Sequence, residues 1–390
     1  MTSTAAVGDD VVERIQRRLA DEHSDPTSSA LARALRAESS GLISDAEMLR
    51  MIRMLQRELV GAGPLADLLA DPTTTDVIVN APDDVRVDRG SGWQDAGVRF
   101  TDEAAVQRLA RRLATAAGRR LDDAQPHVDA RLADGTRLHA VLAPVAASGT
   151  CLSLRVLRPV RHDLAALGRS GSLPGVCGAA LGAILRARLA FLVSGGTGSG
   201  KTTLLSALLA AIPAGERLVT VEDAEELAPP HPHLVRMVAR PANVEGAGAI
   251  SLRELVRQAL RMRPDRIVVG EVRGAEVVDL LAALNTGHEG GAGTVHANTA
   301  RDVPARLEAL AALGGVDRYA LHAQLSGAVQ VILHVHRGPE GRVLQEIAAL
   351  TRAEDGLTSV SAAVVKGVIT EPGAAVLSRM LTDRGVPTPW

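Results

Sequence analysis

The chain is best understood from residues 195–202, which read Gly195-Gly196-Thr197-Gly198-Ser199-Gly200-Lys201-Thr202. This segment matches the pattern G-x-x-x-x-G-K-[ST], follows the apolar run 189–193 and precedes helical spacing at 203–211. Glycines let such a loop curl so that successive backbone N–H groups and the N-terminus of the next helix surround phosphate oxygens. A chance match is a poor explanation, because Lys201 and Lys366 are the only lysines of the chain. The segment therefore predicts a P-loop that binds a nucleoside triphosphate.

The last residues of this segment carry the expected chemistry. Lys201 is expected to reach the β- and γ-phosphates, where a compact point charge suits the loop better than the planar fork of an arginine. Thr202 is expected to place its hydroxyl on Mg²⁺, which neutralises charge as the γ-phosphoryl group leaves. Thr203 completes the predicted nucleotide-binding set. The predicted cofactors are ATP and Mg²⁺.

Two acidic residues stand at the carboxyl ends of predicted strands, where open parallel sheets bind their ligands. Glu222 follows the strand 217–221, and it is expected to polarise the attacking water, against the alternative of an ordinary charged loop. Glu271 follows the strand 266–269, and it is expected to act on Mg²⁺ or on the attacking water, directly or through hydration. Gly270 stands where such a strand customarily carries an aspartate. Glu271 is therefore expected to fill that role alone.

Residues 286–298 place two histidines in a glycine-rich segment. His288 and His296 are eight residues apart, with neither a close cysteine nor a histidine at helical spacing, so they match a zinc site poorly. Sensing of the γ-phosphate fits this segment better. A purely structural histidine is the simplest alternative.

The predicted elements divide the chain into four parts. Residues 1–50 are charged and alanine-rich with helical spacing at 12–19 and at 31–35, which predicts a helical N-terminal extension. Residues 51–158 combine short strands with helices, which predicts an α+β domain. Residues 159–173 lack periodicity and are interpreted as a linker. Residues 174–390 alternate strands with helices, as in a parallel α/β sheet, and they form the predicted P-loop domain.

Hydrophobic spacing also predicts the elements inside the two domains. In the first domain these are helices at 52–59 and 103–117 and strands at 76–80, 84–88, 128–132, 137–141 and 151–157. In the second they are strands at 189–193, 217–221, 266–269, 329–335 and 342–350, with helices at 203–211, 252–261 and 276–284. The residues after 350 are predicted to form a weakly patterned tail.

Composition narrows the class of protein. The net charge is −2 and aromatic residues make up 1% of the chain, which argues against a nucleic-acid surface built on charge and stacking. Cys151 and Cys177 are too few for a disulfide framework. The N-terminus lacks the pattern of an export signal, and the apolar stretch 179–194 contains two arginines and is too short to span a bilayer. We therefore expect a cytoplasmic protein that reaches the membrane only through a partner.

Taken together, four motifs in this order resemble the ATPases of the type II/IV secretion superfamily. They are the Walker A segment 195–202, an Asp box at 219–226, an atypical Walker B strand ending at Glu271 and a His box at 286–298. The phrases at 260–266 and 285–288 look most like the Tad/CpaF branch, which powers tight-adherence and Flp-type pili. The resemblance runs from about residue 50 to 350, and in the first domain it rests on residues 63–65, 79–80 and 128–135.

This resemblance implies an α/β fold, with a RecA-like P-loop NTPase core behind a smaller α+β N-terminal domain and a helical extension. It implies a hexameric ring that works on an inner-membrane platform protein. No specific nucleic acid is expected as a partner, because charge and composition argue against one. It also implies that Glu222 and Glu271 form an acidic catalytic pair and that His296 belongs to the His box. Arginines of the first domain usually complete such a site, and the candidates are Arg137 and Arg155, with Arg273 as a further one.

Three other functions remain open from the sequence. A type IV conjugative secretion ATPase is the closest alternative. A DNA-translocating RecA-like motor shares the core, although charge and composition argue against it. A nucleotide-binding scaffold that no longer hydrolyses is suggested by the missing acid at Gly270.

Overall fold

The computed structural model describes residues 14–15, 18, 27–38, 44–59, 61–156, 163–240, 242–243, 246–338 and 341–390. The chain divides into two compact units, residues 1–158 and 159–390. The expectation of an irregular linker at 159–173 was wrong in part, because helix α6 (Leu164–Arg169) lies within it. Asp163 caps this helix by accepting a hydrogen bond from the Ala166 N–H at 2.6 Å. Residues 159–162 lie outside the described residues.

The first unit opens with two helices that share a small apolar cluster. Helix α2 (Ser28–Glu38) buries Leu31 and Leu35 against Ile52 and Leu55 of helix α3 (Asp45–Leu59). Helix α3 begins seven residues before the predicted helix 52–59. Of the helical spacing expected at 12–19, Ile15 is described and is buried in the same cluster, whereas Val12 and Leu19 lie outside the described residues.

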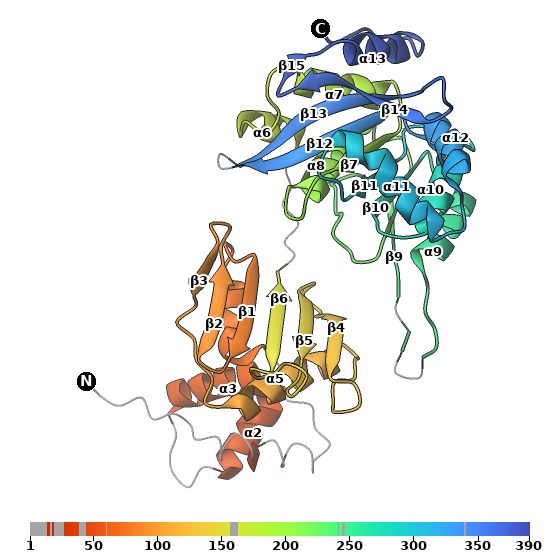
Figure 1. Ribbon diagram of the computed structural model, residues 1–390. Helices are drawn as coiled ribbons and strands as arrows, with labels where there is room; N and C mark the ends of the chain where they lie inside the picture. Colours follow the sequence, from red (N-terminus) through yellow and green to blue (C-terminus); the bar gives the residue numbers. More distant parts are fainter. Residues whose placement is uncertain are drawn as a thin grey trace. The chain divides into compact units, whose positions relative to one another are not determined.

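The sheet of the first unit is six-stranded, antiparallel throughout and ordered β3-β2-β1-β6-β5-β4 (Figure 1). Helix α5 (Glu103–Ala116) buries Val106, Leu109 and Leu113 in the same core as the sheet. The strands are β1 (Asp76–Ala81), β2 (Asp84–Asp88), β3 (Trp93–Asp95), β4 (His127–Arg131), β5 (Arg137–Val141) and β6 (Cys151–Arg155), and the short elements η1 (Gly63–Leu65) and α4 (Ala66–Ala70) precede them. Of these strands, β3 is not among the predicted ones.

The second unit is built on a nine-stranded mixed sheet with the order β15-β14-β13-β12-β7-β11-β10-β8-β9. The six strands from β12 to β9 run parallel, and β12 to β15 pair antiparallel. The parallel part comprises β7 (Phe191–Ser194), β8 (Leu218–Glu222), β9 (Leu234–Val238), β10 (Arg266–Val272), β11 (Ala292–Val295) and β12 (Val331–Gly338). The antiparallel extension comprises β13 (Gly341–Arg352), β14 (Thr358–Val365) and β15 (Val368–Ile369).

Helices cover both faces of this sheet, because successive side chains of a strand point to opposite sides. Phe191 and Val193 of β7 pack into one apolar core, and Leu192 between them packs into the other. The first core holds α6, α7 (Cys177–Arg186), α8 (Lys201–Ala210) and α13 (Gly373–Thr382). The second holds α9 (Leu252–Ala259), α10 (Glu276–Leu284), α11 (Val303–Ala312) and α12 (Arg318–Ala328), as Figure 1 shows. The α/β fold class is confirmed.

Several elements differ from the predicted ones. The tail after residue 350 is ordered, because β14 extends the sheet and α13 buries Leu377 and Leu381 in the first core, so the expectation of a weakly patterned tail was wrong. The predicted helix 252–261 is α9 followed by a 3₁₀ turn, η2 (Leu260–Met262). Strands β9 and β11 and helices α7, α11 and α12 are not among the predicted elements. Within the described ranges, no helix is both long and apolar enough to cross a membrane.

Candidate nucleotide-binding site

The P-loop lies between the buried strand β7 and the first turn of α8. Gly195, Gly198 and Gly200 have φ values of 152°, 69° and 100°, a region of backbone conformation that favours glycine. At Gly195 no other residue fits, since a Cβ there would lie 2.4 Å from the carbonyl oxygen of Val335 on β12. The hairpin formed by β12 and β13 therefore lies directly against the loop. The Arg342 Nε of β13 donates to the Gly198 carbonyl at 3.0 Å, a contact that sequence reasoning did not predict.

Lys201 is buried with only 7% of its surface exposed, and its ammonium group lies inside the curl of the loop. It donates to the carbonyl oxygens of Gly195 at 3.1 Å and Gly196 at 3.0 Å. Burial lowers the pKa of Lys201. The third partner is His296, whose Nδ1 lies 3.3 Å from the Lys201 Nζ. The P-loop and the His box therefore meet at this lysine.

A chain of polar contacts continues from His296 to Glu271. The His296 Nε2 lies 2.5 Å from the Glu271 Oε1, and the other oxygen of Glu271 contacts the guanidinium of Arg273. Arg273 also reaches Asp223 at 2.8 Å. Burial and the positive charge of Lys201 lower the pKa of His296, so the imidazole is neutral at pH 7. In that form Nδ1 accepts from Lys201 and Nε2–H donates to Glu271.

The segment after β8 brings a carboxylate to Thr202 that was not predicted. Thr202 Oγ1 donates to the Glu226 Oε2 at 3.3 Å, whereas the carboxylate of Glu222 points into the protein. A strand-end argument singles out Glu222, since it is the first acid after the apolar run. Glu226 is one of four acidic residues between 222 and 226, and only the path of the loop distinguishes it.

Glu222 instead fixes the loop after β8 through hydrogen bonds made in the protein interior. Only 2% of the residue is exposed, and its Oε1 accepts the backbone N–H groups of Glu226 and Leu227, each at 3.0 Å. Its side chain lies over Gly270 on the neighbouring strand β10, where a Cβ would come within 2.6 Å of the Glu222 Cγ. The position that customarily carries an aspartate is therefore filled by a side chain from β8. Burial raises the pKa of Glu222 to about 7.

The stability of the protein is expected to fall relative to a Glu222→Gln variant as the pH rises from 5 to 8. The folded-state pKa of about 7 exceeds the ordinary value of 4.5, so the folded protein retains a proton that the unfolded chain releases between these values. The stability that this group contributes is complete below pH 4.5 and is lost as the pH rises through 7. The upper bound is about 3 kcal/mol. Urea unfolding at each pH measures it, and parallel pH profiles of the two proteins would contradict the assignment.

The remaining predicted residues divide into two groups. Within the second unit, Arg273 joins the cluster, while the His288 Nδ1 contacts the carbonyl of Ala283. In the first unit, Arg137 and Arg155 lie directly opposite each other on β5 and β6, and Arg155 pairs with Asp76 at 2.9 Å. Their assignment to the nucleotide stays a prediction.

Comparison with known proteins gives the family. The pattern of the family described as "Type II/IV secretion system protein" matches residues 58–361. A Mycobacterium tuberculosis protein named "Putative conjugal transfer protein" is 63% identical over 327 residues, which cover 82% of this chain and 93% of that protein. The conjugal transfer protein TrbB of Rhizobium radiobacter is 31% identical over 303 residues, covering 76% of this chain and 90% of that one.

Solved structures agree on the fold. The pilus retraction motor PilT with bound ADP is 22% identical with a TM-score of 0.52, covering 81% of this chain and 86% of that one. The ATPase DotB of Yersinia pseudotuberculosis is 16% identical with a TM-score of 0.50, covering 88% and 95%. At these identities the likeness concerns the fold alone. The family match, however, spans most of the chain, and we conclude that the protein belongs to the type II/IV secretion system protein family.

Proposed function

We propose that the chain is an ATPase that hydrolyses ATP to ADP and phosphate and powers a secretion or pilus machine. One observation carries this proposal. Lys201 and Thr202 of the P-loop contact His296 and Glu226, which come from two other segments, and His296 in turn contacts Glu271 at the end of β10. A chain that only binds nucleotide has no need of a carboxylate and a neutral imidazole aligned on the lysine that faces the γ-phosphate.

Each residue then has a distinct role. Lys201 leaves its loop carbonyls to bind the β- and γ-phosphates, and the glycine backbone N–H groups of 195–200 surround them. Glu271, fixed by Arg273 on one oxygen, takes the proton of the attacking water through the other. His296 holds that second oxygen in place by hydrogen bonding. Glu222 is proposed as a positioning residue that fixes the loop 223–227, in place of the expected role on water.

The donor set around Thr202 fits Mg²⁺. A hydroxyl and a carboxylate 3.3 Å apart are the oxygen ligands that this ion uses beside a nucleotide, either directly or through water. Bound Mg²⁺ would neutralise charge on the β- and γ-phosphates. We propose that Thr202 and Glu226 hold it, with Glu271 within reach of its hydration shell. Glu226 thus takes the metal-binding role of the aspartate that Gly270 replaces, whereas Glu222 only fills its space.

The machine that this ATPase drives is proposed from the family. We propose a homo-oligomeric ring, hexameric as the resemblance implies, on the cytoplasmic side of an inner-membrane platform protein. The motifs at 260–266 and 285–288 favour Tad/Flp-type pilus assembly. The names of the M. tuberculosis and R. radiobacter relatives favour conjugal transfer as the second candidate. A deletion strain that loses pili but retains DNA transfer supports the first, and the reverse supports the second.

Phosphate release by the purified protein is expected to depend on Mg²⁺, and Glu226→Gln is expected to raise the half-maximal Mg²⁺ concentration about tenfold. The reason is that glutamine keeps the shape of the side chain but loses its charge. Glu225→Gln is the matched control, because Glu225 pairs with Arg236 on β9. Titrating Mg²⁺ at saturating ATP gives the values.

The outcomes separate the candidates. Equal Mg²⁺ dependence in the Glu225→Gln and Glu226→Gln proteins would remove Glu226 from the metal site. Tight ATP binding without turnover at any protein concentration, with or without the membrane partner, would replace the ATPase by a nucleotide-binding scaffold.

A further inference from the structure

The end of strand β10 is irregular at the residue that the proposed function makes the base. Between the paired residues Val269 and Val272, β10 carries two residues where β11 carries only Thr294. These two residues, Gly270 and Glu271, therefore form a β-bulge, which interrupts the ladder and changes the direction of a side chain. On the other side of β10, the pairing with β8 ends at Val269. The backbone that carries Glu271 must be fixed by other contacts.

A hydroxyl group of β11 supplies one of these contacts. The Thr294 Oγ1 donates to the Gly270 carbonyl oxygen at 2.7 Å, the usual length of an O–H···O hydrogen bond. Thr294 is only 2% exposed, so this bond is made in the protein interior, where a carbonyl without a donor is costly. The Gly270 carbonyl shares a rigid peptide plane with the N–H of Glu271. The hydroxyl therefore fixes the plane that leads into Glu271.

The same segment also holds the side chain of Glu271. His296 follows two residues after Thr294, and residues two apart along an extended chain point to the same face. Its Nε2 lies 2.5 Å from the Glu271 Oε1. Thr294 thus fixes the backbone of the proposed base, and His296 fixes its carboxylate.

The turn after β10 is held by a second buried side chain. Glu276, in the first turn of α10, accepts the backbone N–H groups of Arg273 at 2.5 Å and Gly274 at 2.7 Å through its Oε1. Arg273 in turn contacts the carboxylate of Glu271. Thr294 therefore acts on the residue before Glu271, and Glu276 acts on the residues that follow it.

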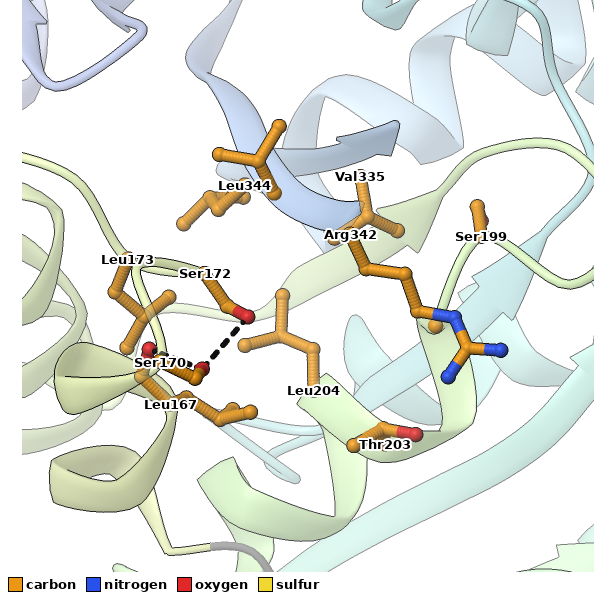
Figure 2. Close-up of a pocket in the computed structure, with 12 residues that line it drawn as sticks. Leu167, Ser170, Ser172, Leu173, Ser199, Thr203, Leu204, Val335, Arg342 and Leu344 are labelled. Atoms are coloured by element: carbon orange, nitrogen blue, oxygen red, sulfur yellow. Dashed lines mark hydrogen bonds between the residues drawn. The ribbon is translucent and has the colours of Figure 1, made fainter. Parts of the chain in front are cut away.

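These contacts are separate from the surroundings of the P-loop. Figure 2 shows the cavity of about 140 Å³ beside the loop, with Ser199, Thr203 and Val335 among the residues that line it. Neither Thr294 nor Glu276 lines this cavity. The groups that the proposed function places on the phosphates contact neither side chain in a printed hydrogen bond of the P-loop, which joins Lys201 to its own carbonyls and to His296. Nucleotide affinity is therefore expected not to depend on them.

We propose that Thr294 is a positioning residue that fixes Glu271 for its reaction with the attacking water, and that Glu276 supports the same carboxylate from the other side. This role rests on the proposed function, because it takes Glu271 to be the base. Without the hydroxyl, the peptide plane before Glu271 is free to rotate, and the carboxylate shifts relative to the water. A shift of about 1 Å at a reacting group can lower a rate about 100-fold.

Thr294→Val is expected to lower kcat for phosphate release about tenfold or more and to leave KM for ATP within about twofold of the wild-type value. Valine keeps the branched shape of threonine and removes only the hydroxyl. Thr294→Ser keeps the hydroxyl and is expected to recover kcat to within about threefold of wild type. Thr220→Val is the matched control, because Thr220 is a buried threonine of β8 whose hydroxyl has no hydrogen-bond partner among the described residues. It is expected to keep the wild-type kcat.

A double variant separates positioning from a general loss of structure. In the Glu271→Gln background, Thr294→Val is expected to change the residual single-turnover rate by less than about twofold, because Thr294 acts through a carboxylate that is no longer present. Urea unfolding shows whether each variant is folded under the assay conditions. If Thr294→Val is unfolded, Glu276 gives the answer. Glu276→Ala is expected to lower kcat, and Glu276→Gln, which keeps an accepting oxygen, is expected to recover it.

The outcomes are distinguishable from those that concern the proposed function. A wild-type kcat in Thr294→Val, an equal loss in Thr294→Ser, or an undiminished effect in the Glu271→Gln background would overturn the positioning role. Wild-type turnover that Glu271→Gln strongly reduces would leave the proposed function standing in each of these cases. Unchanged turnover of Glu271→Gln would overturn the role of Glu271 as the base and the role of Thr294 together.

Discussion

Lys201→Ala is expected to lower the rate of phosphate release at least about 100-fold and to weaken nucleotide binding. Lys201 is the lysine of the loop. Its ammonium group contacts two loop carbonyls and His296. Alanine removes the cation that we propose neutralises the β- and γ-phosphates, and no other lysine lies in the loop. Steady-state phosphate release and nucleotide titration measure the two effects. The variant also removes one of the causes that lower the pKa of His296.

Two controls make this result specific. Lys366→Ala changes the other lysine of the chain, an exposed residue in the turn between β14 and β15, and it is expected to leave turnover unchanged. Lys201→Arg keeps the charge, but its planar fork does not fit the curl of the loop, and it is expected to remain strongly impaired. Turnover of Lys201→Ala within threefold of the wild-type rate would show that hydrolysis takes place elsewhere.

Gly270→Asp is expected to destabilise the protein by roughly 2–4 kcal/mol and to abolish turnover, although it restores the acid that such strands customarily carry. The new Cβ alone would lie 2.6 Å from the Glu222 Cγ, and the carboxylate would meet the buried acid of Glu222. Either Glu222 or β10 must shift, and both position the site. Urea unfolding without nucleotide gives the stability, and phosphate release gives the activity.

Removing the Glu222 side chain tests whether crowding against it causes the loss of stability. Glu222→Ala in the Gly270→Asp background is expected to recover part of the lost stability, because the side chain that occupies the space is gone. Gly270→Ala is expected to give a smaller loss, since it adds the close contact without the second charge. A Gly270→Asp protein that is as stable as wild type and more active would show that the Glu222 side chain does not occupy the space beside Gly270.

The sequence predicted the elements whose patterns are local. Strand β5 and helix α10 have the predicted bounds, because alternation and helical spacing are set by neighbours along the chain. The P-loop was found because its glycines and lysine form one contiguous motif. The short strand β11 was missed because its residues, Ala292 to Val295, include a glycine and belong to a glycine-rich segment.

The residues of the site that were missed depend on contacts distant in sequence. Arg342 reaches Gly198 from 144 residues away, and its place at the start of a predicted strand gives no sign of this. Glu226 is distinguished from Glu222 only by the turn that Glu222 itself holds through two backbone N–H groups. Gly270 was interpreted as a missing acid. In the structure, the absence of a side chain at this position leaves room for Glu222 of the adjacent strand β8.

The strand order has a consequence for how the protein is made. Strand β7, which carries the P-loop, pairs with β11 and β12, and these strands begin at residues 292 and 331. The ribosome makes the loop well before it makes the strands beside it. At about 5–20 residues per second, the delay is on the order of ten seconds. The nascent chain therefore emerges with the P-loop lacking its neighbouring strands, and Val335 comes to lie against Gly195 only when the β12–β13 hairpin has left the ribosome.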